Sequence, residues 1–139
     1  MKNYLIITGC YGAGKTTLKK RLSKYLNEPN IAKEYFDRVE ITEPDCWDKI
    51  IEYAKNNDVS IVETHINYQG KKPKEFVEID KEKVVMPPKN VKIVYKIPDI
   101  EIIKDHLKKR GNRISETSIN NHIYRYEQLA KILKGKVIK

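Results

Sequence analysis

The sequence predicts an α/β fold, a doubly wound parallel sheet with helices on both faces, arranged as three layers. Two observations support this prediction. Short apolar runs typical of buried strands alternate along the chain with longer segments whose apolar residues recur at helical spacing. The segment Gly9–Thr16 also fits the pattern G-x-x-x-x-G-K-[ST] at every fixed position. The alternation of strand-like and helix-like segments favours a parallel sheet between two layers of helices.

The segment Gly9–Thr16 is the sequence of a P-loop, and its context agrees. The apolar run Tyr4–Ile7 precedes it as a buried strand, and apolar residues at helical spacing follow from Leu18 to Leu26. Its glycines let successive N–H groups point inward around an anion. A glycine-rich turn with an ordinary surface lysine is the alternative. We expect the P-loop NTPase fold and ATP contacts from Gly9, Tyr11, Gly12, Ala13, Gly14, Lys15, Thr16 and Thr17.

Two side chains of the loop have predicted roles, and a third residue joins them from another strand. Lys15 is expected to reach the β and γ phosphates, and the Thr16 hydroxyl to bind Mg²⁺. Val59–Thr64 is typical of a buried strand with polar residues only at its end. Because ligands lie beyond the carboxyl ends of the strands in open α/β sheets, Glu63, Thr64 and His65 should face the P-loop. Glu63 is the second expected Mg²⁺ ligand, and a capped strand-end carboxylate is the alternative; His65 is a substrate contact or a structural residue.

The second strand and the helix after it are expected within residues 31–56. One short strand lies somewhere in 31–41, and Thr42–Asp45 has the cap candidate and proline of a helix start. Trp47, Ile50, Ile51 and Ala54 then form one apolar stripe. The segment of about residues 66–90 contains two β-like runs, Phe76–Ile79 and Val84–Met86. We interpret it as an insertion, with a hairpin as one form that it could take.

The last part of the chain predicts a strand, two helices and a closing strand. Val91–Ile97 is a clear strand, and Pro98-Asp99 opens a helix that stops near Gly111. Ser115 can cap the last helix, which Gly135 ends before the strand Val137-Ile138. The residues of that helix expected to face inward are Ile119, Ile123, Tyr126, Ala130 and Leu133.

Length and composition indicate one domain spanning residues 1–139, with no second domain. The formal net charge of +9 favours a polyanionic partner, although lysine-rich surfaces also serve solubility or heat tolerance. Cys10 and Cys46 are too few for a disulfide framework, which predicts a reducing compartment. No apolar run is long enough for a signal peptide or a membrane span. We therefore expect a cytoplasmic protein without a membrane partner; nothing predicts its oligomeric state.

These features together resemble the small P-loop kinases, and most of all the kinase module of polynucleotide 5′-hydroxyl kinases. Glu63-Thr64 with Asn67 is similar to the strand tip of that family, and Arg110-Gly111-Asn112-Arg113 to its short lid, here about residues 110–116. The resemblance implies transfer of the γ-phosphoryl group of ATP to the hydroxyl of a nucleic-acid 5′ end or a similar nucleotide-sized acceptor. Nucleoside and nucleotide kinases share most of these features.

The resemblance also implies candidates for catalysis. Arg110 and Arg113 are expected to close over the phosphates, with solvated charges at a helix end as the alternative. Arg125 is expected near the lid or the base of ATP, or on the surface. The kinases resembled place an aspartate after the second strand as general base with an arginine beyond it. Here Glu34 and Asp37, followed by Arg38, fall in that region without matching the spacing.

Two other functions remain open. A nucleoside or nucleoside monophosphate kinase needs a closed pocket for one base, built from residues 31–89. A P-loop switch or ATPase of another class needs mobile switch segments and a guanine-reading Asn-Lys-x-Asp motif, and the sequence contains no such motif. The lysines of residues 71–89, with Tyr68 and Phe76, hold nucleic-acid phosphates and stack a base in one interpretation, and form a solvated insertion in the other.

Overall fold

The computed structural model describes residues 2–10, 12–26 and 35–139. In these ranges five parallel strands form one sheet in the order β2-β3-β1-β4-β5. The central strand, β1, pairs with β3 on one side and β4 on the other. The strands are β1 (Tyr4–Gly9), β2 (Tyr35–Glu40), β3 (Ile61–Asn67), β4 (Val91–Lys96) and β5 (Lys136–Ile138).

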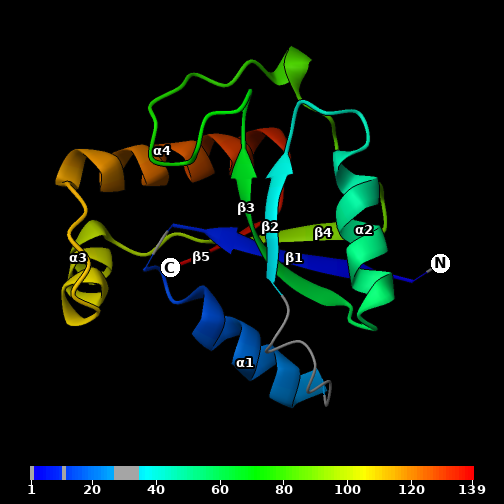
Figure 1. Cartoon of the computed structure of the whole chain (residues 1–139), viewed down its shortest axis with the longest axis horizontal. Helices are drawn as coiled ribbons and strands as arrows, with labels where there is room; N and C mark the ends of the chain where they lie inside the picture. The colour runs from blue at the N-terminus through cyan, green and yellow to red at the C-terminus, as the bar shows by residue number, and fades with distance from the viewer. Residues whose placement is uncertain (1, 11, 27–34) are drawn as a thin grey trace.

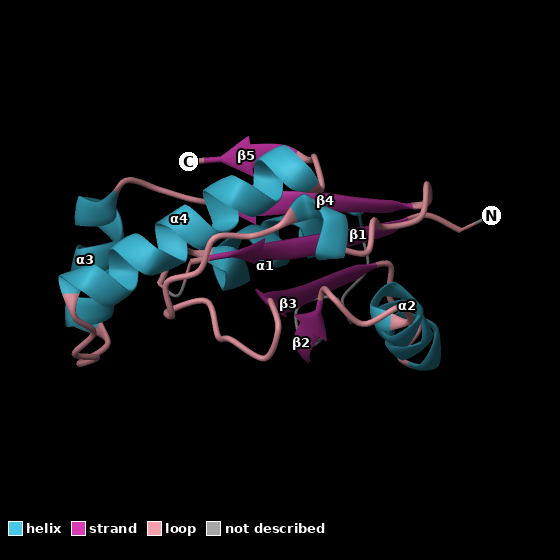
Figure 2. Cartoon of the chain, turned by 90° about the horizontal axis from the view of Figure 1, so that it is seen from above, coloured by secondary structure: helices cyan, strands magenta, loops and turns pink. Residues whose placement is uncertain are grey.

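Helices cover both faces of this sheet. Figure 1 shows α1 on one side of the strands and α4 across the other, and Figure 2 shows α4 lying over β1 and β4. The predicted three-layer α/β fold is confirmed. Among the described residues, no helix is long and apolar enough to cross a lipid bilayer. The helices are α1 (Lys15–Leu26), α2 (Cys46–Asn56), α3 (Ile100–Lys109) and α4 (Glu116–Ile132).

The core forms because the central strand is apolar on both faces. Ile6 and Ile7 of β1 point to opposite sides of the sheet, and both are essentially fully buried. On α2 the predicted stripe is buried at Trp47, Ile50 and Ala54. Periodicity therefore identified the apolar faces of these elements correctly.

The third strand, β3, extends three residues beyond its predicted end at Thr64. Its polar part pairs with β2, where Arg38 lies opposite His65 and Glu40 opposite Asn67. Through this pairing the backbone N–H and C=O groups of the polar residues are hydrogen-bonded to β2, so the strand continues beyond the point where its sequence turns polar. Glu63 and His65 are therefore held rigidly inside the strand.

Two details of the helices differ from the prediction, one boundary and one buried face. The helix start at residues 42–45 is instead a pair of turns, in which the Cys46 N–H donates to the Glu43 carbonyl, and α2 begins at Cys46. On α4, Ser115 caps the helix as predicted, its Oγ accepting from the Ser118 N–H at 3.1 Å. The buried face of α4, however, includes Arg125, whereas Ile123, predicted to face inward, is only half-buried.

The connection between β3 and β4 contains no hairpin. Apart from an isolated bridge of Tyr68 with Lys71, it forms one 3₁₀ turn, η2 (Lys81–Lys83). Side chains replace the missing strand partner: Gln128 of α4 donates to the Val77 carbonyl at 2.9 Å and accepts from the Ile79 N–H at 2.8 Å. The β-like runs therefore lie extended against neighbouring elements without pairing with each other (Figure 1).

Candidate active site

The P-loop joins β1 to α1 in a conformation that requires glycine. Gly9, Gly12 and Gly14 all have positive φ angles, of 139°, 80° and 91°. A Cβ atom on Gly9 would also collide with the carbonyl oxygen of Lys96 in β4. Substitution of Gly9 would therefore strain the loop and push it away from the sheet. Tyr11, a predicted ATP contact, lies outside the described residues.

The loop borders a cavity of about 210 Å³, which we call the P-loop cavity. Its wall combines the loop and the first residues of α1 with side chains from β2, β3 and the turn after α3. Predicted residues far apart in the sequence thus meet around one space. The lining residues are Gly12, Ala13, Gly14, Lys15, Thr16, Tyr35, Glu63, His65 and Arg110.

Lys15 is buried at the base of this cavity. Its Nζ donates to the Gly9 carbonyl at 2.9 Å and to the Cys10 carbonyl at 3.4 Å. Burial lowers the pKa of Lys15 to about 8, although attraction by Glu63 acts in the opposite direction. Neutral carbonyls are weaker partners for an ammonium group than phosphate oxygens are. The ammonium can therefore exchange these partners for an anionic ligand.

Thr16 and Glu63 bring two oxygen atoms together beside the loop. The Thr16 hydroxyl donates to Oε1 of Glu63 at 3.4 Å. The described residues contain no cluster of three or more His, Cys, Asp or Glu side chains that could hold a metal alone. Mg²⁺ typically binds one or two protein oxygens and takes its other ligands from phosphates and water. The Thr16–Glu63 pair fits that requirement.

Lys19 is a residue at this site that sequence reasoning missed. Its Nζ lies 3.0 Å from Oε1 of Glu63, and both side chains are buried. Lys19 follows Lys15 by four residues, so the helical repeat places both lysines on the same face of α1. The spacing of four residues from Lys15 is the feature of the sequence that could have identified Lys19. The carboxylate of Glu63 is thereby neutralised and fixed in place.

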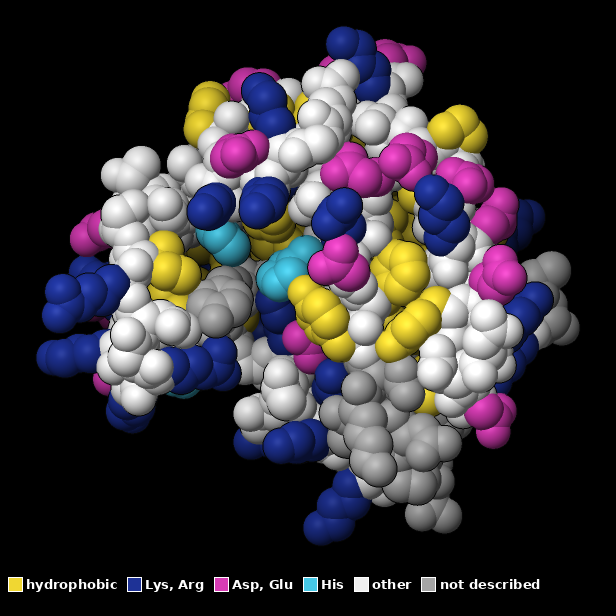
Figure 3. All heavy atoms as spheres, in the orientation of Figure 1, with side chains coloured by type: hydrophobic (Ala, Val, Ile, Leu, Met, Phe, Trp, Pro, Cys, Tyr) yellow, Lys and Arg dark blue, Asp and Glu magenta, His cyan; other side chains and the backbone are white. Residues whose placement is uncertain are grey.

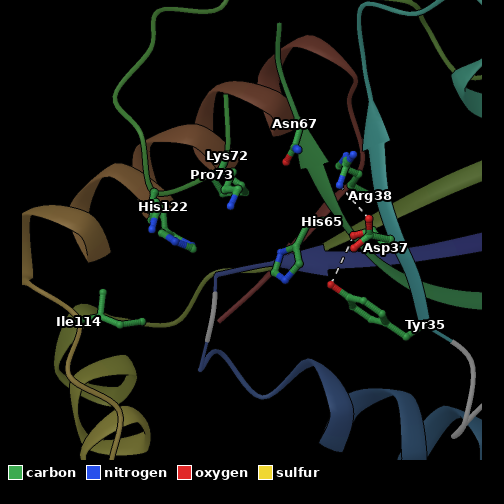
Figure 4. A pocket seen from close by; sticks show the side chains of 10 residues that line it. Tyr35, Asp37, Arg38, His65, Asn67, Lys72, Pro73, Ile114 and His122 are labelled. Carbon is green, nitrogen blue, oxygen red and sulfur yellow. Dashed lines mark hydrogen bonds and ion pairs between the residues drawn. The ribbon is translucent and has the colours of Figure 1, made fainter. Parts of the chain in front are cut away.

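A second cavity, of about 370 Å³, adjoins the first (Figure 4). Tyr35 and His65 line both cavities, and their rings meet edge to face with centroids 6.0 Å apart. These two side chains therefore form the junction between the cavities. Figure 3 shows the histidines in a hollow on this face of the molecule, with lysine and arginine side chains around it.

Asp37 lies in the wall of the second cavity, on β2. The pairing of β2 with β3 shifts register between Phe36 and Arg38, so Asp37 sits at a bulge of the strand. Bulges change the direction of a side chain and often occur beside active sites. The Asp37 carboxylate is exposed and accepts from Arg38 at 2.8 Å. Glu34, the other predicted base, lies outside the described residues.

Two histidines of the second cavity are uncharged near neutral pH. Burial, reinforced by the positive charge of Lys15, lowers the pKa of His65 to about 3 and that of His122 to about 4. The Tyr126 hydroxyl lies 3.4 Å from Nδ1 of His65 and accepts from the Ile66 N–H at 3.3 Å. Neutral imidazoles at these positions can orient a polar ligand without adding charge.

Comparison with solved structures identifies the fold. The deoxyadenosine kinase of M. mycoides, solved with bound dATP, matches with a TM-score of 0.55 and 17% identity, over 99% of this chain and 90% of that chain. The chain has the P-loop NTPase fold. At this identity the match establishes the fold alone. The shikimate kinase of Acinetobacter baumannii in complex with shikimate matches with a TM-score of 0.48 and 13% identity, over 100% of this chain and 84% of that chain.

The structure that establishes the fold is not that of a polynucleotide kinase, so the finer resemblance to that family gains no support from it. No protein-family model matches the sequence, and no curated protein does. Within the P-loop NTPase fold, the site must therefore be interpreted from this chain's own residues.

Three predicted ATP or lid residues are not among those that line the P-loop cavity. Arg125 is 1% exposed, and its guanidinium donates to the carbonyls of Ile66, Lys71 and Lys72 at 3.1–3.2 Å. It anchors the chain after β3 and does not line the P-loop cavity, and its contact with the lid or the base of ATP stays a prediction. Arg113 is exposed and lines a separate hollow beside α3, and Thr17 is exposed on α1 without lining the P-loop cavity.

Proposed function

We propose that the protein is a magnesium-dependent kinase that transfers the γ-phosphoryl group of ATP to a hydroxyl of a nucleotide-sized acceptor. The observation that supports this most directly is the contact between the two cavities at Tyr35 and His65. A kinase must bind donor and acceptor in adjoining spaces, because most of its rate comes from positioning and charge neutralisation. A hydrolase or switch needs no second cavity of this size.

The donor half of the site is assigned to the P-loop cavity. Lys15 and the loop N–H groups bind the phosphates, and Arg110 approaches from the turn after α3 to neutralise charge on the moving phosphoryl group. Thr16 and Glu63 hold Mg²⁺, directly or through water. When bound, the ion supplies positive charge to the phosphate oxygens.

The acceptor half is assigned to the second cavity. An acceptor hydroxyl at the junction is in position for an oxygen–phosphorus bond to form while the bond from the γ-phosphorus to the bridging oxygen of ADP breaks. Asp37 lines the acceptor side and is the assigned base for the hydroxyl proton. Arg38 donates to the Asp37 carboxylate at 2.8 Å and orients it.

Two acceptor classes are supported by different observations. Arg38, Lys72 and Lys74 around the second cavity, with the net charge of +9, favour a nucleic-acid 5′ end or another phosphate-bearing acceptor. The fold shared with a deoxyadenosine kinase favours a nucleoside. We place the phosphate-bearing acceptor first, because the charge belongs to the cavity itself.

The test is transfer of labelled γ-phosphate from ATP to a panel of acceptors. The panel contains 5′-hydroxyl DNA and RNA oligomers, nucleosides and nucleoside monophosphates, and Lys15→Ala is the inactive control. Transfer to at least one class, abolished in the control, supports the kinase. Transfer to nothing, with hydrolysis of ATP alone, would overturn it in favour of an ATPase or switch.

A further inference from the structure

Positive charge is distributed unevenly around the wall of the second cavity. In the wall of this cavity, the charge of Arg38 is balanced by Asp37 at 2.8 Å. The part of the cavity that is not shared with the P-loop cavity is lined by Lys72 and Lys74, together with His122 and Asn67. Neither lysine forms an ion pair with a carboxylate in the part of the chain that the structure describes. The end remote from the P-loop therefore carries uncompensated positive charge.

Asn67 provides an independent observation at the same end. It is the last residue of β3, only 6% exposed, and it lines the cavity. Its backbone carbonyl accepts from the Ile41 N–H, but within the described ranges its side-chain amide forms no hydrogen bond. Figure 4 shows this amide and Lys72 pointing into the same space. Because a buried amide normally has a partner, this one is available to a ligand.

The backbone that carries the two cavity lysines, Lys72 and Lys74, is held in place by side chains of α4. The carbonyls of Lys71 and Lys72 accept from the buried guanidinium of Arg125, and Asn121 of α4 donates to the Lys74 carbonyl at 3.1 Å. Pro73, between the two cavity lysines, is buried. The backbone that carries both ammonium groups is therefore fixed, although the ammonium groups themselves are exposed.

We propose that this remote end binds an anionic group, a phosphate or a carboxylate, that the acceptor itself carries. The inference rests on the proposed function, since it places the reacting hydroxyl at the Tyr35–His65 junction and the anion at the other end. Lys72 and Lys74 supply charge, and the Asn67 amide supplies a directed N–H donor. The acceptor is then an alcohol that is recognised both at its reacting hydroxyl and at its anionic group. A neutral nucleoside offers only the hydroxyl.

Binding by titration calorimetry separates this inference from the kinase activity. The P-loop cavity is itself an anion site, so the protein is first saturated with ADP and Mg²⁺. Two matched pairs of probes are then compared: adenosine with adenosine 3′-monophosphate, and glucose with gluconate. We expect the anionic member of at least one pair to bind 10-fold or more tightly. The pair that shows this preference distinguishes phosphate from carboxylate.

The variants are Lys72→Met, which removes one charge, and Asn67→Asp, which keeps the shape of the side chain but repels an anion. Lys83→Met, on η2 outside the cavity, is the matched control. The preference should fall at least fivefold in the first two variants and be unchanged in the third. Equal binding of neutral and anionic probes, or a preference that survives both variants, would overturn the inference.

Failure of ADP to bind would count against the proposed function instead. In that case the same probes are titrated into Lys15→Ala without nucleotide, which removes the main cation of the P-loop cavity. A preference that still depends on Lys72 supports the anion site, and one that does not depend on it rejects the site.

Discussion

The ammonium nitrogen of Lys19 lies 3.0 Å from a carboxylate oxygen of Glu63, in an ion pair that is buried beside the P-loop. Removing one partner of such a pair leaves an uncompensated buried charge. Lys19→Met should therefore destabilise the protein by about 3–5 kcal/mol. Replacing both partners, as Lys19→Met with Glu63→Gln, should restore most of that loss.

Urea unfolding of the two variants and the wild type measures this coupling. Lys20→Met is the control, because Lys20 is the exposed neighbour of Lys19 on α1. Equal, small effects of Lys19→Met and Lys20→Met would show that the ion pair does not contribute.

Asp37→Asn should lower turnover far more than it lowers ATP affinity. The carboxylate lines the second cavity and not the P-loop cavity, and a general base typically contributes about 10²–10⁴-fold in rate. Steady-state kinetics with the best acceptor measures kcat, and ADP titration measures donor binding. Asp48→Asn, at an exposed site on α2, is the matched control. An unchanged kcat would exclude Asp37 as the base.

Arg110 and Arg113 should differ in effect although they are three residues apart. Arg110 lines the P-loop cavity and Arg113 does not. Loss of a charged hydrogen bond of about 1.5–3 kcal/mol in the transition state predicts a 10- to 150-fold fall in kcat/KM for Arg110→Ala. Arg113→Ala should stay within about twofold of the wild type. Equal losses would instead indicate that both arginines reach the phosphates.

Stability should fall as the pH is lowered below about 6.5, the usual pKa of histidine. The folded protein holds the pKa of His65 at about 3 and that of His122 at about 4, so the unfolded chain binds more protons in this range. Each residue therefore contributes stability that is present above pH 6.5 and is lost at about 1.4 kcal/mol per pH unit as the pH falls.

Urea unfolding at pH 7.5, 6, 5 and 4.5 measures this dependence. His65→Gln and His122→Gln should each make it shallower. A profile as steep in both variants as in the wild type would show that other groups cause the loss.

Arg125→Met should destabilise the protein without weakening ADP binding. The buried guanidinium donates to three carbonyls, and its loss leaves them without that partner. We expect a loss of about 3 kcal/mol or more in the free energy of unfolding. Equilibrium unfolding and ADP titration measure the two effects, with Arg21→Met on the exposed face of α1 as control. A weakened affinity for ADP at unchanged stability would restore Arg125 to the nucleotide site.

The fold and the position of the P-loop could be predicted because their signals are local. The P-loop pattern spans eight residues, and the apolar period of each strand and helix is visible within its own segment. Glu63 could be placed near the loop because the ends of parallel strands meet at one edge of the sheet, and Arg110 because its Arg-Gly turn resembles the lid of the small P-loop kinases.

The acceptor half could not be predicted, because its residues depend on contacts between distant segments. The bulge at Asp37 exists only through pairing with β3, and the burial of Arg125 depends on carbonyls more than fifty residues away. The end of β3 was placed too early for the same reason. Polar residues can complete a strand when a neighbour satisfies their backbone, and no single segment reveals that neighbour.

The β3–β4 connection is held by side-chain hydrogen bonds, such as those of Gln128 with Val77 and Ile79, and has no ladder of its own. Through Lys72 and Lys74 this connection also forms part of the wall of the second cavity. Sequence changes there can alter that wall while leaving the pairing of β1 with its neighbours and the P-loop unchanged. Under the proposed function, this segment is therefore where we expect homologues with different acceptors to diverge, while the P-loop is retained.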